Sequence, residues 1–245
     1  MGEREIVTLK HIMKNSPLSV NVIQMFASGV KVGRGPSPPS FIVLEYLTGG
    51  DLLDLLKHLE GIEKSLLARP PTSLSKWWII IQILSGVAAL HQIGCVHLDL
   101  KPENILMSAW EEGRCVITDF GFADVGNDQK LERMTKVLGT EKYAAPEILN
   151  PPYDGRLVDL YACGVIAYTI NNLRNCFSWR GRGGPGDGDM NRAEEFTQMT
   201  EMTMKNIAQR QEQLKKEGGG ANERYDVNAL ACVLMDVDPA RRVGA

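Results

Sequence analysis

Three short motifs in a fixed order constrain the fold of this chain most strongly. Residues 97–104 read H-L-D-L-K-P-E-N, residues 119–121 read D-F-G, and residues 145–147 read A-P-E. Each motif is short enough to occur by chance. Together they place carboxylates, a lysine and an asparagine within one irregular polar stretch. Such a stretch predicts a functional site built from loops on a packed scaffold.

The segments around this stretch predict an α+β fold, with a small first part and a mainly helical second part. Helical spacing of apolar residues marks residues 3–14, 73–93 and 157–171. Short strand patterns mark residues 20–27 and 41–46. We expect the first part to span residues 1–47 and the second part residues 48–245.

The second part contains an expected insertion at about residues 180–220. Residues 180–190 are rich in glycine and predict a flexible loop. Residues 191–216 are rich in charge and predict a surface-exposed helix. No repeat is visible elsewhere in the chain.

In this order and at these separations, the motifs resemble the signature of eukaryotic-type Ser/Thr protein kinases. The catalytic loop would span residues 95–106 and the activation segment residues 119–147. The resemblance covers nearly the whole chain and implies a protein-kinase-like fold. It also implies transfer of the γ-phosphoryl group of ATP to a Ser or Thr hydroxyl of a protein, with Mg²⁺ as the second cofactor. Lys101 and Thr140 are typical of Ser/Thr rather than Tyr kinases.

The resemblance implies catalytic roles for Asp99, Lys101 and Thr140. Phosphoryl transfer depends mainly on positioning and on charge neutralisation. Asp99 would orient the attacking hydroxyl and accept its proton, Lys101 would neutralise charge on the transferred group, and Thr140 would bond to both. Asn104 and Asp119 would supply the hard oxygen ligands that Mg²⁺ prefers.

The resemblance also implies nucleotide contacts for five residues of the chain. Glu45 and Leu47 would bond the adenine edge through their backbones, and Leu106 would lie under the ring. Asp51 would contact the ribose, and Glu5 would pair with the ATP-binding lysine of the family. Three of them have plainer interpretations: Glu5 as a surface glutamate, Asp51 as a helix cap and Leu106 as a core residue.

Two further resemblances are structural. Asp159 resembles the aspartate that anchors the catalytic-loop backbone in kinases. Arg242 resembles the arginine that pairs with the glutamate of A-P-E, here Glu147. A buried carboxylate needs such a partner.

Leu98 occupies the position where many kinases carry an arginine that binds a phosphate on the activation segment. Leucine cannot form that charge pair, and Lys136 aligns with the phosphorylated residue, next to Thr135. We therefore expect activity without activation-segment phosphorylation. A leucine here resembles the calmodulin-dependent and myosin-light-chain kinases, which implies a regulatory tail or a calmodulin-like regulator outside this chain.

Substrate choice is the least specified feature of the resemblance. Basophilic relatives use two acids to hold an arginine of the substrate. Glu103 matches one of these acids, and Thr169 stands at the place of the other. The sequence therefore supports a preference for basic Ser/Thr peptides only in part.

The chain also departs from the family at its two ends. It begins at the helix that would carry Glu5, so the glycine-rich loop and the ATP-binding lysine are not in it, and it stops just after Arg242. We expect a fragment or an incomplete gene model, with weak or absent catalysis by this chain alone. Two other interpretations remain: a pseudokinase-like scaffold, and a regulatory fragment that competes for kinase partners. The enzyme is favoured because the chain retains Asp99, Lys101, Asn104 and Asp119.

Composition argues against several other classes of protein. A net charge of -3 gives no reason to expect nucleic acid or an anionic membrane as the main partner. Five cysteines without a C-x-x-C pair argue against a disulfide framework or a zinc site and favour a reducing, cytoplasmic location. The most apolar run, residues 77–90, is too short to span a bilayer.

Overall fold

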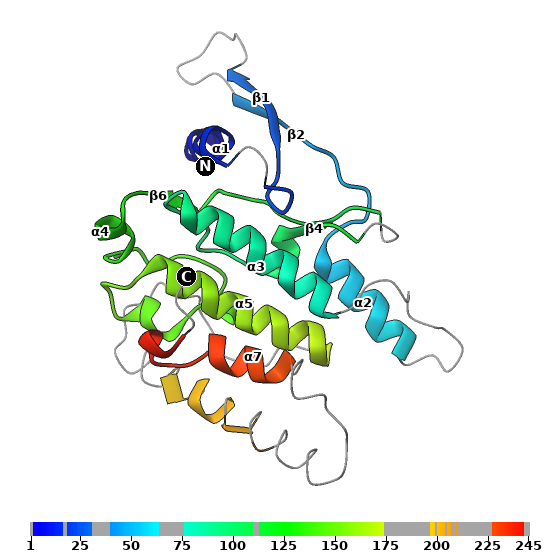
Figure 1. Ribbon diagram of the computed structural model, residues 1–245, viewed down its shortest axis with the longest axis vertical. Coiled ribbons are helices and arrows are strands. Elements are labelled where there is room, and N and C mark those ends of the chain that lie inside the picture. The colour runs from blue at the N-terminus through cyan, green and yellow to red at the C-terminus, as the bar shows by residue number, and fades with distance from the viewer. Residues whose placement is uncertain are drawn as a thin grey trace.

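The computed structural model describes residues 2–16, 19–30, 40–63, 76–109, 113–173, 197–198, 200–203, 205–206, 209 and 227–242. Figure 1 shows a helix and a two-stranded hairpin on one side of the molecule and stacked helices on the other. This arrangement is the α+β fold that the sequence predicts.

The first part of the chain consists of helix α1 (Gly2–Asn15) and an antiparallel hairpin, β1 (Met25–Val30) with β2 (Ser40–Leu44). The helix forms where the apolar spacing predicts it. Leu9 and Ile12 are fully buried, whereas Val7 faces outward. Helix α1 is therefore amphipathic and packs by one face.

The predicted strand at residues 20–27 is wrong in its first half. The backbones of Asn21 and Ile23 form two hydrogen bonds with Ile117, each 2.9 Å long, and Val22 makes only an isolated bridge there. Residues 21–23 therefore attach the first part to the helical part of the molecule. The ladder with β2 begins only at Met25 and continues to residue 30.

The second part of the chain contains most of the helices. They are α2 (Leu52–Glu63), α3 (Lys76–Gln92), α4 (Asp128–Leu131), α5 (Gly155–Asn172) and α7 (Val227–Leu234). In the described residues, short 3₁₀ turns accompany them at Pro102–Asn104, Glu141–Tyr143, Pro146–Leu149 and Pro239–Arg241.

Short strands connect these helices and carry the predicted functional loops. Strand β3 (Cys95–Val96) pairs with β6 (Asp124–Val125), and β4 (Ile105–Met107) pairs with β5 (Cys115–Ile117), both antiparallel. The catalytic loop thus begins on β3 and ends on β4. Residues 119–121 lie between β5 and β6.

Helices α3 and α5 form the centre of the helical part, where α3 packs on α5 and α5 packs on α7 (Figure 1). Both have apolar residues on nearly every face, as expected for buried helices. The Asp154 side chain caps α5 by accepting a hydrogen bond of 2.9 Å from Arg156 N. The predicted helices at 73–93 and 157–171 are thus present, although residues 73–75 lie outside the described part.

The expected insertion at 180–220 is described only in part. Its glycine-rich loop at 180–190 lies outside the described residues. Those described between 197 and 209 are helical, as predicted. However, Thr200 is fully buried, and its hydroxyl lies 3.1 Å from the Tyr161 hydroxyl of α5. The expected exposed helix therefore packs at least this residue into the core.

The structure describes four of the five cysteines. Four described cysteines, Cys95, Cys115, Cys163 and Cys232, are free thiols. Burial raises the pKa of Cys115 to about 12, so this thiol is inert at neutral pH.

None of the helices in the described part combines the length and the apolar character needed for a membrane span.

Candidate active site

The catalytic loop is attached to helix α5 through Asp159. Asp159 Oδ2 accepts a hydrogen bond from His97 N and Oδ1 accepts one from Leu98 N, each at 2.8 Å. The Asp159 side chain is 1% exposed. The backbone contact that the resemblance implies is therefore present. It fixes Leu98 at φ 64, a left-handed conformation that costs a residue with a side chain about 1–3 kcal/mol.

The same carboxylate also contacts His91 of helix α3, whose Nε2 lies 3.0 Å from Asp159 Oδ2. His91 Nδ1 is buried without a hydrogen-bond partner. This geometry assigns the proton to Nε2, which donates to Asp159. Sequence analysis missed His91, because a histidine in an apolar helix gives no signal of its partner.

His97 connects the catalytic loop to the segment of the D-F-G motif. Its Nε2 donates to Thr118 O at 2.9 Å, and its Nδ1 accepts from Asp99 N at 3.3 Å. The ring packs against Phe120 with 5.1 Å between centroids. The two motifs are thus held in register by a single buried side chain.

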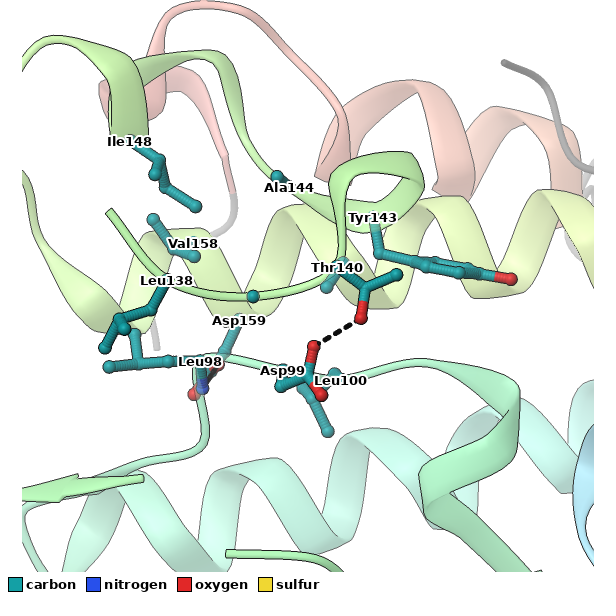
Figure 2. A pocket seen from close by; sticks show the side chains of 12 residues that line it. Leu98, Asp99, Leu100, Leu138, Thr140, Tyr143, Ala144, Ile148, Val158 and Asp159 are labelled. Carbon is teal, nitrogen blue, oxygen red and sulfur yellow. Dashed lines mark hydrogen bonds between the residues drawn. The ribbon is translucent and has the colours of Figure 1, made fainter. Parts of the chain in front are cut away.

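Asp99, Lys101 and Thr140 form a closed hydrogen-bonded triangle. Lys101 Nζ donates to Asp99 Oδ2 at 2.8 Å and to Thr140 Oγ1 at 2.9 Å, and Thr140 Oγ1 donates to Asp99 Oδ1 at 2.7 Å. Figure 2 shows the bond between Asp99 and Thr140. The structure therefore brings together all three predicted catalytic residues, with the carboxylate almost fully buried.

Gly139 allows the activation segment to approach the catalytic loop at this point. A Cβ at this position would lie 2.7 Å from Leu98 O, and the residue has φ 103. Only glycine adopts this conformation without strain. The position before Thr140 is thus fixed by backbone contact.

Asn104 lies on the catalytic loop and Asp119 on the D-F-G segment, and the two segments are joined by a hydrogen bond of 3.0 Å from Thr118 N to Asn104 O. Asn104 Nδ2 donates to Asp99 O at 2.8 Å and to Asp99 Oδ2 at 3.2 Å. Both bonds use the side-chain nitrogen Nδ2, which leaves the side-chain oxygen Oδ1 of Asn104 for a ligand. Asp119 is exposed with φ 62, and its Oδ1 accepts from Gly121 N at 3.2 Å. One amide oxygen and one carboxylate suit a hard cation such as Mg²⁺.

Glu5 on helix α1 faces the D-F-G segment. Burial raises the pKa of Glu5, and the nearby Asp119 carboxylate raises it further, while a hydrogen bond from Phe120 N opposes the shift. Glu5 is partly buried rather than fully exposed. Its pairing with a lysine remains a prediction.

The residues predicted to contact adenine and ribose lie along the connection between β2 and α2. Glu45 N donates to Gln24 O at 2.9 Å, and the Glu45 side chain pairs with Arg114. Asp51 Oδ1 accepts from Asp54 N at 2.8 Å, which confirms Asp51 as the cap of α2. Asp51 also forms an isolated bridge with Leu106.

Those contacts bring Asp51 and Leu106 next to each other, from segments more than fifty residues apart. Leu106 is partly buried and packs against the hydrophobic core. Leu47, which follows the hinge strand, packs against the hydrophobic core. The nucleotide contacts of these residues, and of Glu45, remain predictions.

The end of the activation segment is fixed by the expected ion pair between Arg242 and Glu147. Arg242 Nη2 donates to Glu147 Oε2 at 2.9 Å, and Nη1 contacts Glu147 Oε1. The guanidinium also donates to Leu157 O and Asp236 O and lies over the Tyr161 ring. A bidentate pair with an almost fully buried arginine is a strong structural contact.

Leu98 lies among residues that, within the described part of the chain, are mainly apolar and include no basic side chain. It borders a cavity of about 10 Å³ between the catalytic loop, the activation segment and α5 (Figure 2). A cavity of this size is near the minimum for one water molecule. Its lining consists mainly of apolar side chains, among them Leu138, Ile148 and Val158. Leu98 therefore replaces a possible phosphate contact with packing.

The middle of the activation segment is attached to the chain just before α5. Met134 and Tyr153 exchange backbone hydrogen bonds at 2.8 and 3.0 Å, and the Tyr153 hydroxyl donates to Lys136 O. Thr135 and Lys136 are exposed. The segment thus follows a defined path without a phosphate.

With this geometry in place, comparisons with known proteins define the class. The model of the protein kinase domain family matches residues 2–245. The chain therefore belongs to the protein kinase family.

The curated relatives are Ser/Thr protein kinases. The chain is 36% identical over 169 residues to CBL-interacting serine/threonine-protein kinase 26 of Arabidopsis thaliana. The aligned region covers 68% of this chain and 34% of the relative. It is 38% identical over 138 residues to serine/threonine-protein kinase grp of Drosophila melanogaster, covering 56% of this chain and 25% of the relative.

A third relative, serine/threonine-protein kinase chk1 of Schizosaccharomyces pombe, is 35% identical over 131 residues, which cover 53% of this chain and 24% of the relative. The matched region thus spans about a third or less of the length of these curated relatives.

Proposed function

We propose that this chain supplies catalytic machinery of a Ser/Thr protein kinase, which transfers the γ-phosphoryl group of ATP to protein hydroxyls. The observation that carries the proposal is the triangle of Asp99, Lys101 and Thr140, with distances of 2.7–2.9 Å. A buried carboxylate held by a lysine and a hydroxyl can orient a second hydroxyl and receive its proton.

In this proposal each member of the triangle has one role. Asp99 orients the substrate hydroxyl and accepts its proton, and Lys101 offsets the negative charge that develops on the transferred group. Thr140 keeps the activation segment next to Asp99, so the substrate-binding surface and the catalytic loop keep a constant separation. Preorganised charge of this kind acts without reorganisation during the reaction.

Asn104 and Asp119 are proposed to hold Mg²⁺ beside the ATP phosphates. Bound magnesium would supply positive charge that neutralises the phosphate oxygens. Asn104 itself is positioned by its two bonds to Asp99, so the metal-binding and proton-accepting groups share one rigid loop. This coupling supports the choice of Asn104 as a ligand.

The adenosine part of ATP is proposed to lie against Leu47, Leu106 and the backbone of Glu45. Asp51 lies beside Leu106 through a backbone bridge, at the start of α2. Because its carboxylate already caps α2, a ribose contact would use the remaining lone pairs. Glu5 is proposed to hold a lysine between α1 and the phosphates, where its carboxylate lies near Asp119.

We propose that the substrates are proteins with Ser or Thr acceptors, with at most a partial preference for basic sequences. Glu103 is exposed in the catalytic loop and is accessible to a substrate arginine. Thr169 is buried, and its hydroxyl donates to Val165 O at 2.7 Å. Position 169 therefore does not reach a substrate.

Regulation is proposed to act through contacts outside this chain rather than through a phosphate on the activation segment. Leu98 cannot bind a phosphate, and the segment is held by other contacts. The plant relatives are named as CBL-interacting kinases, and this name supports a protein regulator. We propose a regulatory tail or a calmodulin-like regulator outside this chain. A cytoplasmic location, with free thiols as described above, belongs to the same proposal.

Transfer of ³²P from Mg²⁺-ATP to Ser, Thr and Tyr peptides tests the proposed function. The wild-type protein of this assay is the chain joined to a glycine-rich loop and the ATP-binding lysine of the family, because the chain alone should transfer phosphate weakly or not at all. We expect transfer to the Ser and Thr peptides, and a loss of about 100-fold or more in Asp99→Asn. Asp128→Asn, which removes an exposed carboxylate on α4, is the matched control and should transfer normally. Equal transfer by Asp99→Asn and wild type, or transfer to Tyr alone, would refute the proposal. Mg²⁺-ATP binding without transfer by the wild type would favour a scaffold.

A further inference from the structure

Asp124 joins helix α1 to the segment that follows the D-F-G motif. Its Oδ2 lies 3.1 Å from Arg4 Nη2 of α1, and its Oδ1 lies 2.5 Å from Lys130 Nζ of α4. Arg4 Nε also donates to Ala123 O at 3.0 Å. One carboxylate and its neighbouring carbonyl thus hold α1 by two contacts.

The carboxylate of Asp124 is ionised and partly shielded from water. Its side chain is 16% exposed. Burial alone would raise the pKa of Asp124, but hydrogen bonds from Lys130 and Val125 N and the charges of Lys130 and Arg4 together lower it. The pair with Arg4 is therefore charged at neutral pH.

The contact lies next to a site of electrostatic repulsion. Arg4 precedes Glu5, and burial together with the negative charge of Asp119 raises the pKa of Glu5. Two neighbouring carboxylates repel each other and favour separation of α1 from residues 119–121. The pair of Arg4 with Asp124 opposes that separation.

The other end of α1 is held by a different contact. His11 Nε2 donates to Ile93 O at 2.8 Å, close to the end of α3. His11 lies seven positions after Arg4, which is about two turns, or roughly 10 Å, along a helix. Loss of the Asp124 contact should therefore release only the N-terminal turns of α1.

We propose that Asp124 is a positioning residue that holds the N-terminal half of α1, and with it Glu5, against the D-F-G segment. Its effect on α1 follows from the contacts alone, whereas its consequence for catalysis rests on the proposed kinase function. Asp124 carried no signal in the sequence, because its partner Arg4 lies 120 positions away.

Amide hydrogen exchange of Asp124→Asn tests this inference. Asparagine keeps an acceptor for Val125 N–H, which donates to Asp124 Oδ1 at 2.8 Å, but removes the charge. We expect the amides of residues 6–10 and of Phe120 to exchange about fivefold faster, with α3 and α5 unchanged. Asp124→Glu should restore most of the protection.

Asp128→Asn is the matched control, because Asp128 is also an acid in this segment but pairs with Arg156 of α5. It should leave α1 unchanged. Arg4→Gln should reproduce the effect of Asp124→Asn, and the double variant should be no worse than either single variant. Unchanged α1 exchange in Asp124→Asn, additive effects, or faster exchange throughout the core would overturn the inference.

Phosphoryl transfer separates this inference from the proposed function. In Asp124→Asn we expect kcat to fall about fivefold with the peptide KM unchanged, because Glu5 moves while the substrate surface does not. A normal kcat despite faster exchange in α1 would overturn the catalytic consequence. If no variant or wild type transfers phosphate, the proposed function fails, and the exchange cycle still decides the role of Asp124 in holding α1.

Discussion

The catalytic loop and the activation segment meet at Thr140, but they are held in place by different kinds of contact. The catalytic loop is attached to α5 by the buried Asp159 carboxylate, and its own side chains bond to one another. The middle of the activation segment is held by the backbone bonds between Met134 and Tyr153 and by ion pairs near the surface. Arg156 there contacts Asp154, Asp128 and Glu132, two of which are largely exposed.

This difference indicates which geometry is constant and which can be changed. Buried charged hydrogen bonds are costly to break, because the groups left behind cannot reach water. Exposed ion pairs contribute little and weaken with salt. We therefore expect the catalytic loop to keep its conformation over a wide range of conditions, while the activation segment responds to salt and to bound partners.

The largest effect should follow from changing the anchor of the catalytic loop. Asp159→Asn places an amide donor among three donors, His91 Nε2 and the backbone N–H groups of His97 and Leu98. We expect the free energy of unfolding to fall by about 3 kcal/mol in denaturant titrations. Asp154→Asn, at the cap of the same helix, should cost about 1 kcal/mol or less. Equal effects of the two variants would remove the contrast between the two regions.

A smaller effect is expected where the activation segment ends in a buried contact. Glu147→Gln leaves the Arg242 guanidinium without its carboxylate, and we expect a loss of about 2 kcal/mol in thermal or denaturant unfolding. Arg241→Gln is the matched control, because Arg241 is largely exposed, and it should change stability by less than about 0.5 kcal/mol. A negligible effect of Glu147→Gln would show that this end of the segment resembles its middle.

Salt should affect the middle of the activation segment more than the catalytic loop. Between about 0.05 and 1 M NaCl we expect amides of residues 128–136 to exchange about two- to fivefold faster, while those of residues 96–105 stay constant. Arg156→Gln at low salt should reproduce the change. If salt accelerates both regions equally, the distinction between them is wrong.

The smallest effect should come from the exposed Thr135. With Leu98 unable to bind a phosphate, Thr135→Ala and Thr135→Glu should each change the rate of peptide phosphorylation by less than about tenfold. Mass spectrometry of the assayed protein would exclude a hidden phosphate. A larger change in either variant would mean that this segment depends on a charge at position 135.

The sequence predicted the parts of the site in which residues are close along the chain or occur in motifs. Asp99, Lys101 and Asn104 stand in H-L-D-L-K-P-E-N, and the resemblance of this motif to that of protein kinases selected them. The resemblance added the distant partners Thr140, Asp159 and Arg242, and the structure shows their hydrogen bonds. Periodicity gave the long helices, because α3 and α5 are apolar on most faces.

Other features depend on tertiary contacts that no local pattern reveals. The strand predicted at residues 20–27 starts late, because Asn21 and Ile23 bond to Ile117 of the other part. Thr200 lies in a charged segment, yet it is buried against Tyr161. The contacts of His91 with Asp159, and of Arg4 with Asp124, join residues 68 and 120 positions apart.

Single-turnover phosphoryl transfer by variants of the triangle tests the account most directly. If Asp99, Lys101 and Thr140 act as a unit, the triple variant Asp99→Asn, Lys101→Met, Thr140→Val should be about as slow as Asp99→Asn alone, at least about 100-fold below wild type. Losses that multiply across the three single variants, or an Asp99→Asn variant that transfers phosphate at the wild-type rate, would contradict the assignment of this triangle as the catalytic centre.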